Sequence, residues 1–147
     1  MRGILNGFWK WAGITAEAYA AHGMAHSWRS DEFDYPAFDA LVEYAICTTK
    51  KAEPTSEEIE QTLLIMALDN EGENVLDALT GNCSETTLLT FIERGVNHIQ
   101  PNVRWQIAEL LYRRKPQGFM ELLKALSADD HPYVRKRALN VLRYLQE

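Results

Sequence analysis

Two segments near the C-terminal end of the chain share a pattern of residue types at a fixed offset of 31 residues. One begins at Pro101 and the other at Pro132, and in each the proline is followed by Val-Arg and four apolar residues at matching positions. Proline is favoured at the first position of a helix, and the valine begins an apolar stripe that continues four, seven and eight residues later. Because a period of about 20–50 residues in a helical chain is typical of stacked helix pairs, the repeat predicts a solenoid.

The remainder of the chain also has the pattern of helices. No window alternates between apolar and polar residues as a strand bounded by hairpin turns does. Apolar stripes at helical spacing, favourable first-turn residues and breaks at Gly or Pro place helices at 15–28, 36–49, 56–68, 74–79, 84–93, 101–114, 118–127 and 132–145. We therefore predict an all-α chain.

The segment 118–145 resembles a HEAT repeat. Its first helix carries paired leucines, a turn with Asp129, Asp130 and Pro132 follows, and the second helix opens with Val-Arg. In that family the turn aspartate and the arginine of Val-Arg pair with neighbouring repeats. The resemblance therefore implies that Asp130, together with Arg104 and Arg135, has a mainly structural role.

The segment 84–114 is similar to the same repeat but degenerate. There His98-Ile99-Gln100 stands in place of the aspartates of the turn. It is therefore open whether the aspartate–arginine pairs between repeats form a continuous series. A further divergent pair at 36–68 lacks Val-Arg. The resemblance implies a single domain, in which residues 36–147 form a short right-handed α-solenoid of HEAT-like helix pairs and residues 1–35 form an N-terminal helical cap.

Charge is distributed unevenly along the chain. The net charge is −6, but residues 1–99 hold 6 basic and 16 acidic side chains, and residues 100–147 hold 9 basic and 5 acidic ones. These counts give −10 and +4 for the two parts. A net acidic chain argues against nucleic acid as a partner. The basic clusters at 113–115 and 135–137 keep one alternative open, a nucleic-acid-binding HEAT-like protein related to the DNA glycosylases that use a basic concave face.

Length and composition indicate one globular domain. A chain of 147 residues, 46% of them hydrophobic, is long enough to bury one core. Polar residues interrupt the apolar run at 1–14, so we expect a first helix that packs on the body and no membrane partner. Cys47 and Cys83 are 36 residues apart without a CxxC pattern, which is typical of a reducing compartment. We therefore expect a cytoplasmic protein.

Three groups of side chains could carry chemistry, and each also has a structural interpretation. His22 and His26 would share a helix face and could hold a metal, but no third ligand lies at helical spacing. Residues 69–73 are rich in oxygen ligands but lack the full spacing of a calcium loop. Cys47, His98 and an aspartate could form a nucleophilic site, although no motif links them. Because the common catalytic and nucleotide-binding motifs are absent, we predict no enzyme, no catalytic residue, no metal and no cofactor.

The strongest candidate site is a helix face opposite the buried apolar stripe of each repeat. Residues at i, i+4 and i+7 on that face of one second helix should lie beside the equivalent residues of the next, because second helices stack. The residues of this predicted face are Trp105, Glu109, Tyr112, Lys136, Asn140 and Arg143. Trp, Tyr and Arg are enriched at binding hot spots. The alternative is that Trp105 packs against an adjacent helix or the N-terminal aromatic residues.

Together these features predict a non-catalytic protein-interaction module, because arrays of stacked helix pairs present extended binding surfaces. One concrete version is a small inhibitor or immunity protein that masks a basic toxin or nuclease, since the acidic balance of residues 1–99 would speed the capture of a basic protein. The oligomeric state stays open between a monomer and a homodimer that buries Trp105.

Overall fold

The computed structural model describes residues 2–22 and 35–147, and this part of the chain is helical without strands. Its helices are α1 (Arg2–Ala12), α2 (Ala16–His22), α3 (Tyr35–Thr49), α4 (Ser56–Leu68), α5 (Asn74–Gly81), α6 (Glu85–Gly95), α7 (Pro101–Arg114), α8 (Phe119–Leu126) and α9 (Pro132–Leu145). The all-α prediction is confirmed for these residues. The predicted bounds of α4, α7 and α9 also agree with the observed ones.

The starts of α4, α7 and α9 suit the first turn of a helix. The Thr55 hydroxyl accepts a hydrogen bond from the backbone N–H of Glu58 at 3.1 Å, and the Glu58 carboxylate accepts one from the Thr55 N–H at 2.9 Å. This capping box pairs two backbone donors that the start of α4 would otherwise leave open. Pro101 and Pro132 begin α7 and α9, where a missing backbone N–H removes no helical bond.

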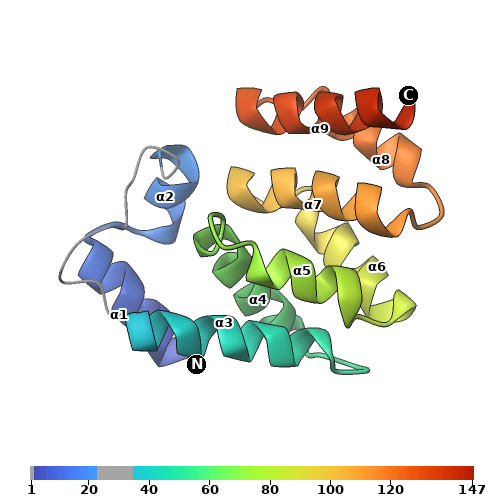
Figure 1. Ribbon diagram of the computed structural model, residues 1–147. Helices are drawn as coiled ribbons and strands as arrows, with labels where there is room; N and C mark the ends of the chain where they lie inside the picture. Colours follow the sequence, from blue (N-terminus) through green and yellow to red (C-terminus); the bar gives the residue numbers. More distant parts are fainter. Residues whose placement is uncertain (1, 23–34) are drawn as a thin grey trace.

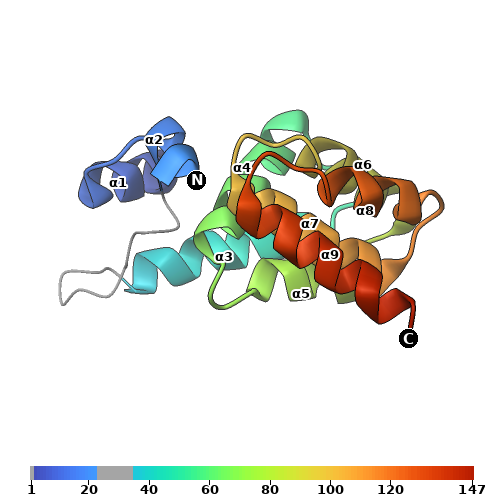
Figure 2. The same ribbon diagram turned by 90° about the horizontal axis from the view of Figure 1, so that it is seen from above.

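The helices from α3 onward form two layers. Helices α3, α5, α7 and α9 lie side by side in one layer, with α9 at the edge (Figure 1). Helices α4, α6 and α8 lie behind them, as the view from above shows (Figure 2). Helix α7 packs against α5 on one side and α9 on the other, and α6 and α8 also contact it. An inner helix of this layer therefore leaves little of its surface open, whereas α9 has one side that no described helix covers.

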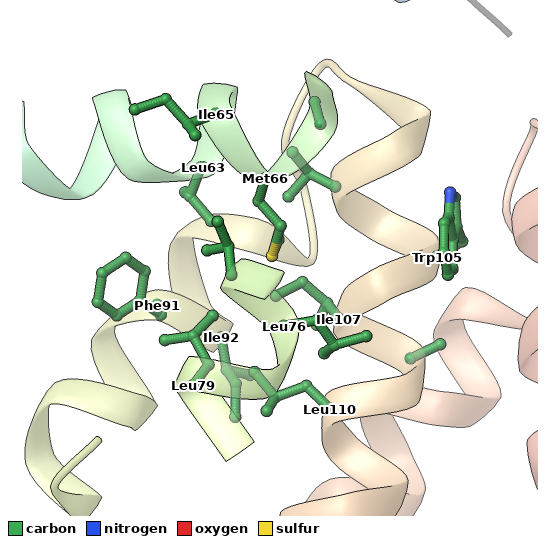
Figure 3. Close-up of a cluster of buried hydrophobic side chains, with 14 of the residues drawn as sticks. Leu63, Ile65, Met66, Leu76, Leu79, Phe91, Ile92, Trp105, Ile107 and Leu110 are labelled. Atoms are coloured by element: carbon green, nitrogen blue, oxygen red, sulfur yellow. The ribbon is translucent and has the colours of Figure 1, made fainter. Parts of the chain in front are cut away.

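The core fills the space between the layers. Apolar side chains of α4, α5, α6 and α7 converge there, among them Leu63, Met66, Leu76, Leu79, Phe91, Ile92, Ile107 and Leu110 (Figure 3). Burying such side chains is the main favourable contribution to folding. Helix α6 comes so close to α7 that a Cβ at Gly95 would lie 2.6 Å from two carbons of Ile107. A larger residue at the end of α6 would therefore force the buried Ile107 side chain to shift.

Helix α2 packs on the body through a buried tyrosine, whereas α1 contacts α3. Tyr19 on α2 is almost fully buried, and its hydroxyl donates a hydrogen bond to the Ala67 carbonyl at 3.2 Å. The same oxygen accepts hydrogen bonds from the side-chain amides of Asn70 at 3.3 Å and Asn102 at 2.9 Å. Because buried polar atoms are costly unless they are paired, this network fixes α2 against α4 and α7.

The turn before α9 is tied to α7 by an arginine. Arg104 donates from Nε and from a terminal nitrogen to the two carboxylate oxygens of Asp129, at 2.8 and 3.0 Å. The expected pairing of Asp130 with Arg104 is present at 3.3 Å, but the Asp130 side chain is 96% exposed and Asp129 makes the shorter contacts. The physical reason is that the Asp129 carboxylate also accepts the backbone N–H of His131 at 2.9 Å, which holds it inside the turn. Arg135 donates to the Asp129 carbonyl at 2.6 Å, so both Val-Arg arginines have structural contacts.

A histidine takes the aspartate's place in the preceding turn. His98, 31 residues before Asp129, accepts the backbone N–H of Gln100 at its Nδ1 (3.1 Å), as Asp129 accepts that of His131. Its Nε2 lies 2.8 Å from a carboxylate oxygen of Glu60 on α4. The turn before α7 is therefore also linked to the preceding helices, although its sequence has no aspartate.

Candidate partner-binding face

The structure buries Trp105 between α7 and α9. Its side chain is only 4% exposed, and its ring meets that of Tyr133 edge-on, with centroids 5.7 Å apart and planes at 89°. The Arg137 guanidinium lies 4.3 Å from the centroid of the Trp105 ring, and the indole N–H donates to the Asn102 side-chain oxygen at 3.0 Å. The expectation of an exposed Trp105 is wrong, and the alternative, packing against an adjacent helix, describes its environment.

The physical reason is the position of α7 in its layer. Figure 3 shows Trp105 on the side of α7 away from the core cluster. That side is where α9 packs, so it is covered as well. Helical spacing placed Trp105 opposite the buried stripe correctly, but in an inner helix the opposite side faces another helix instead of solvent.

Glu109 is also held by α9, through Arg137. Its carboxylate oxygen accepts hydrogen bonds from two nitrogens of Arg137, at 2.7 and 3.0 Å. Arg137 also donates to the Tyr133 hydroxyl at 2.9 Å. Glu109 and Arg137 therefore join α7 to α9, and a partner would have to break that pair to use either charge.

Tyr112 remains accessible, and it has an aromatic neighbour that the sequence analysis did not include. Tyr112 is 37% exposed, and its ring centroid lies 6.5 Å from that of Tyr144, which is 57% exposed. The Lys115 ammonium lies 5.5 Å from the centroid of the Tyr112 ring. The signal for Tyr144 was its place four residues after Asn140, on the same face of the second helix.

The remaining predicted residues lie on α9 and are accessible. Lys136 and Arg143 are exposed, and Asn140 is half-buried. Arg143 donates to the Asn140 side-chain oxygen at 3.0 Å. The structure thus divides the predicted face: Trp105 and Glu109 are used in packing α7 on α9, whereas Tyr112, Lys136 and Arg143 are open to a partner.

Much of the basic charge of the C-terminal part is already engaged. Arg113 lies 2.8 Å from a carboxylate oxygen of Asp77 on α5. Arg114 donates to the carbonyls of Leu79 and Cys83, both at 3.0 Å, where the end of α5 leaves carbonyls without helical donors. The cluster at 113–115 therefore keeps only Lys115 without an anionic partner among the described residues.

The other candidate groups have structural contacts. His98 and Cys47 have different neighbours, since the thiol lies 3.8 Å from a Glu43 carboxylate oxygen and His98 binds Glu60. The hydrogen bond from His98 lowers the pKa of the Glu60 carboxyl. Asp69 is buried and accepts the backbone N–H of Val75 at 3.1 Å, and burial raises its pKa.

The metal prediction for the two histidines lies outside the described residues, because the His22 side chain and all of His26 are not described. Within the part of the chain that the structure describes, no group of three or more His, Cys, Asp or Glu side chains is arranged to hold a metal ion. None of the helices in that part combines the length and the apolar composition needed to cross a bilayer.

Comparison of the chain with protein-family models, with curated proteins and with solved structures gave no match. The resemblance to HEAT repeats therefore rests on the residues of the two C-terminal helix pairs alone.

Proposed function

We propose that this chain is a non-catalytic protein-interaction module, built as a short right-handed solenoid of HEAT-like helix pairs that acts in the cytoplasm. Two observations support the solenoid: a 31-residue sequence repeat, and the stacking of α7 on α9 in one layer with α6 and α8 behind (Figures 1 and 2). In this proposal the outward face of the α3–α5–α7–α9 layer receives the partner, as concave faces of helical arrays do.

The observation that carries the proposal is the pair of exposed tyrosines at the C-terminal ends of α7 and α9. Tyr112 and Tyr144 come from neighbouring helices and lie against each other with much of their surface in solvent. Arg143 on α9 and Lys115 beside the Tyr112 ring add positive charge. Tyrosine and arginine provide large contact areas with polar ends, and they dominate the binding energy of many interfaces.

A narrower version of the proposal is an inhibitor or immunity protein that masks a basic toxin or nuclease. Its support is the acidic end of the layer, where Asp39 and Glu43 lie one turn apart on α3 and are exposed. Neither forms an ion pair with the described residues. A basic protein would be attracted to this end, and complementary charge raises the rate of such encounters.

The test is a pull-down with the full chain as bait, followed by mass spectrometry at low and at high salt. We expect a specific protein partner, and we expect its binding to weaken at least tenfold when Tyr112 and Tyr144 are both replaced by Ala. The matched control is Leu89→Ala, because Leu89 is also an exposed large apolar side chain but lies on α6 in the other layer. The absence of any partner, or equal losses in both variants, would contradict the proposal. A partner that is acidic would contradict the narrower version only.

Nucleic-acid binding is the competing function, and the exposed cations Lys115, Lys136 and Arg143 are the residues that favour it. It predicts a salt-sensitive gel shift with DNA or RNA that is lost when Lys136 and Arg143 are replaced by Ala. The absence of a shift at low salt would dismiss it.

A further inference from the structure

One side of α9 is open along its whole length. The exposed residues on this side follow one another at intervals of four and three, which keeps them on a single face of a helix. They are Pro132, Lys136, Leu139, Arg143 and Gln146. We call this set the α9 stripe. Leu139, at its centre, is 53% exposed.

The same stripe on α7 is buried under a helix pair. The residues 31 positions earlier include Pro101, Trp105 and Ala108, all of which are buried, while Tyr112 and Lys115 at the end of α7 are exposed. Trp105 shows what covers this side, because it packs on Tyr133 and Arg137 of α9. On α7 this side receives another helix, whereas on α9 no described helix occupies it.

The chemistry of the α9 stripe differs from that of α7. Lys136 stands at the position of Trp105, Leu139 at that of Ala108, and Arg143 at that of Tyr112. Helix α9 contains four basic residues and no acidic one. Lys136 and Arg143 form no ion pair with the described residues, and Arg143 donates a hydrogen bond to the neutral Asn140. The stripe thus presents one apolar side chain between two cations that have no anionic partner among the described residues.

We propose that the α9 stripe docks an acidic amphipathic helix of a partner protein, in the place that α9 itself takes on α7. Leu139 contacts the apolar side of that helix. Carboxylates on its rim pair with Lys136 and Arg143, which are seven residues apart and therefore separated by about 10 Å along the helix axis. Helix-in-groove recognition of this kind reads apolar anchors at helical spacing and uses charge to select the partner.

The inference rests on the proposed function in one respect, that the partner is a protein. It does not depend on the partner's net charge, because a basic protein can carry an acidic helix. An apolar leucine at the centre of the stripe favours a helix over a nucleic-acid backbone, which would meet only two cations here and would be repelled by the exposed Asp130 in the adjoining turn.

The test is a selection from a displayed library of random helical peptides on the full chain. Peptides that also bind the double variant Lys136→Glu with Arg143→Glu are removed by counter-selection. We expect the enriched peptides to be acidic and to carry apolar residues at i, i+3 or i+4, and i+7. In isotope-labelled protein, one such peptide should shift amide resonances of α9 and leave those of α3 unchanged. Its affinity should fall at least tenfold in the double variant and in Leu139→Asp.

The matched control is Lys10→Glu with Lys50→Glu, which changes the net charge by the same amount at two exposed positions far from α9 in the sequence. This control should retain the affinity, because the effect is local to the stripe. No enrichment, enrichment of basic peptides, resonance shifts outside α9, or equal losses in the two double variants would each overturn the inference. A partner found by pull-down whose binding survives Lys136→Glu with Arg143→Glu would overturn it too, yet would leave the proposed function standing.

Discussion

Helices α7 and α9 have the same sequence pattern and very different surroundings. Both begin with proline, continue with Val-Arg and bury the valine, yet Trp105 on α7 is buried whereas Lys136 at the equivalent position of α9 is exposed. The difference comes from position, because α7 lies between two helices of its layer and α9 lies at the edge (Figure 1). In a stack of this kind, the side of an inner helix that lies opposite the core is covered by the next helix, so a residue there serves packing. The equivalent residue of the edge helix is exposed and available for binding.

The largest expected difference between the two helices is at Trp105 and Lys136. Trp105→Ala should lower the free energy of unfolding by about 3–5 kcal/mol, because it removes a buried aromatic ring from the α7–α9 contact. Lys136→Ala should change it by less than about 0.5 kcal/mol, as is usual for exposed positions. Urea denaturation of the two variants measures both values. Similar losses would mean that the two helices are covered alike.

The two Val-Arg arginines should also differ. Arg104→Ala removes a two-pronged ion pair in which the side chains of Arg104 and Asp129 are 12% and 10% exposed. We expect a loss of about 2–3 kcal/mol, in the range of hydrogen bonds to charged groups. Arg135→Ala removes a single hydrogen bond to a backbone carbonyl, and we expect about 1 kcal/mol. A thermal melt of each variant shows which one loses more stability. A greater loss for Arg135→Ala than for Arg104→Ala would contradict the prediction.

Exchanging the sizes of equivalent apolar residues tests the packing on each side. Ala108 is fully buried, so Ala108→Leu should overfill its site and cost about 1–3 kcal/mol. Leu139→Ala should cost less than about 0.5 kcal/mol, because the Leu139 side chain is largely exposed to solvent. Urea denaturation again gives both numbers. A large loss for Leu139→Ala would show that the α9 side is covered in solution.

The smallest expected effect is a dependence of stability on pH through Asp129. Burial alone would raise the pKa of Asp129, but the hydrogen bonds from Arg104 and from the His131 backbone outweigh it and hold the pKa below its usual value. The unfolded chain therefore binds the proton first, at a pH of about 4. The stabilisation is complete above that pH and is lost as the pH falls through the lower pKa of the folded state.

Asp129→Asn is the variant that isolates this effect. It should be less stable than the natural chain at neutral pH, and the difference should shrink as the pH falls below about 4. Denaturation curves at a series of pH values give the two stabilities side by side. A stability difference that stays constant down to acidic pH would contradict the prediction. It would show that the stabilisation by Asp129 does not depend on the charge of its carboxylate.

The sequence predicts the features of this fold that depend on neighbouring residues. Pro101 and Pro132 mark helix starts because proline fits the first turn, and the spacing of Val134, Ala138 and Val141 shows which side of α9 is buried. These signals are local, since a helix brings residues three and four apart onto one face regardless of the rest of the chain.

Contacts between distant parts of the chain were not predictable in the same way. Trp105 and Arg137 are 32 residues apart, and helical periodicity gives no information about which helix lies over an indole ring. Tyr19 and Asn102 are 83 residues apart, and no repeat relates them. The choice of Asp129 over Asp130 depends on how the turn is rotated, which two adjacent aspartates do not reveal.

The most direct test of the contrast between α7 and α9 is the rate at which a thiol reagent reaches equivalent positions. The chain supplies its own references, because Cys47 is exposed and Cys83 is buried, with a pKa that burial raises to about 11. In a chain with both native cysteines replaced by Ser, a thiol introduced by Leu139→Cys should react about as fast as Cys47 does in the natural chain. A thiol introduced by Ala108→Cys should react as slowly as Cys83. Equal rates at the two positions would contradict the account, because they would mean that the two helices are equally covered.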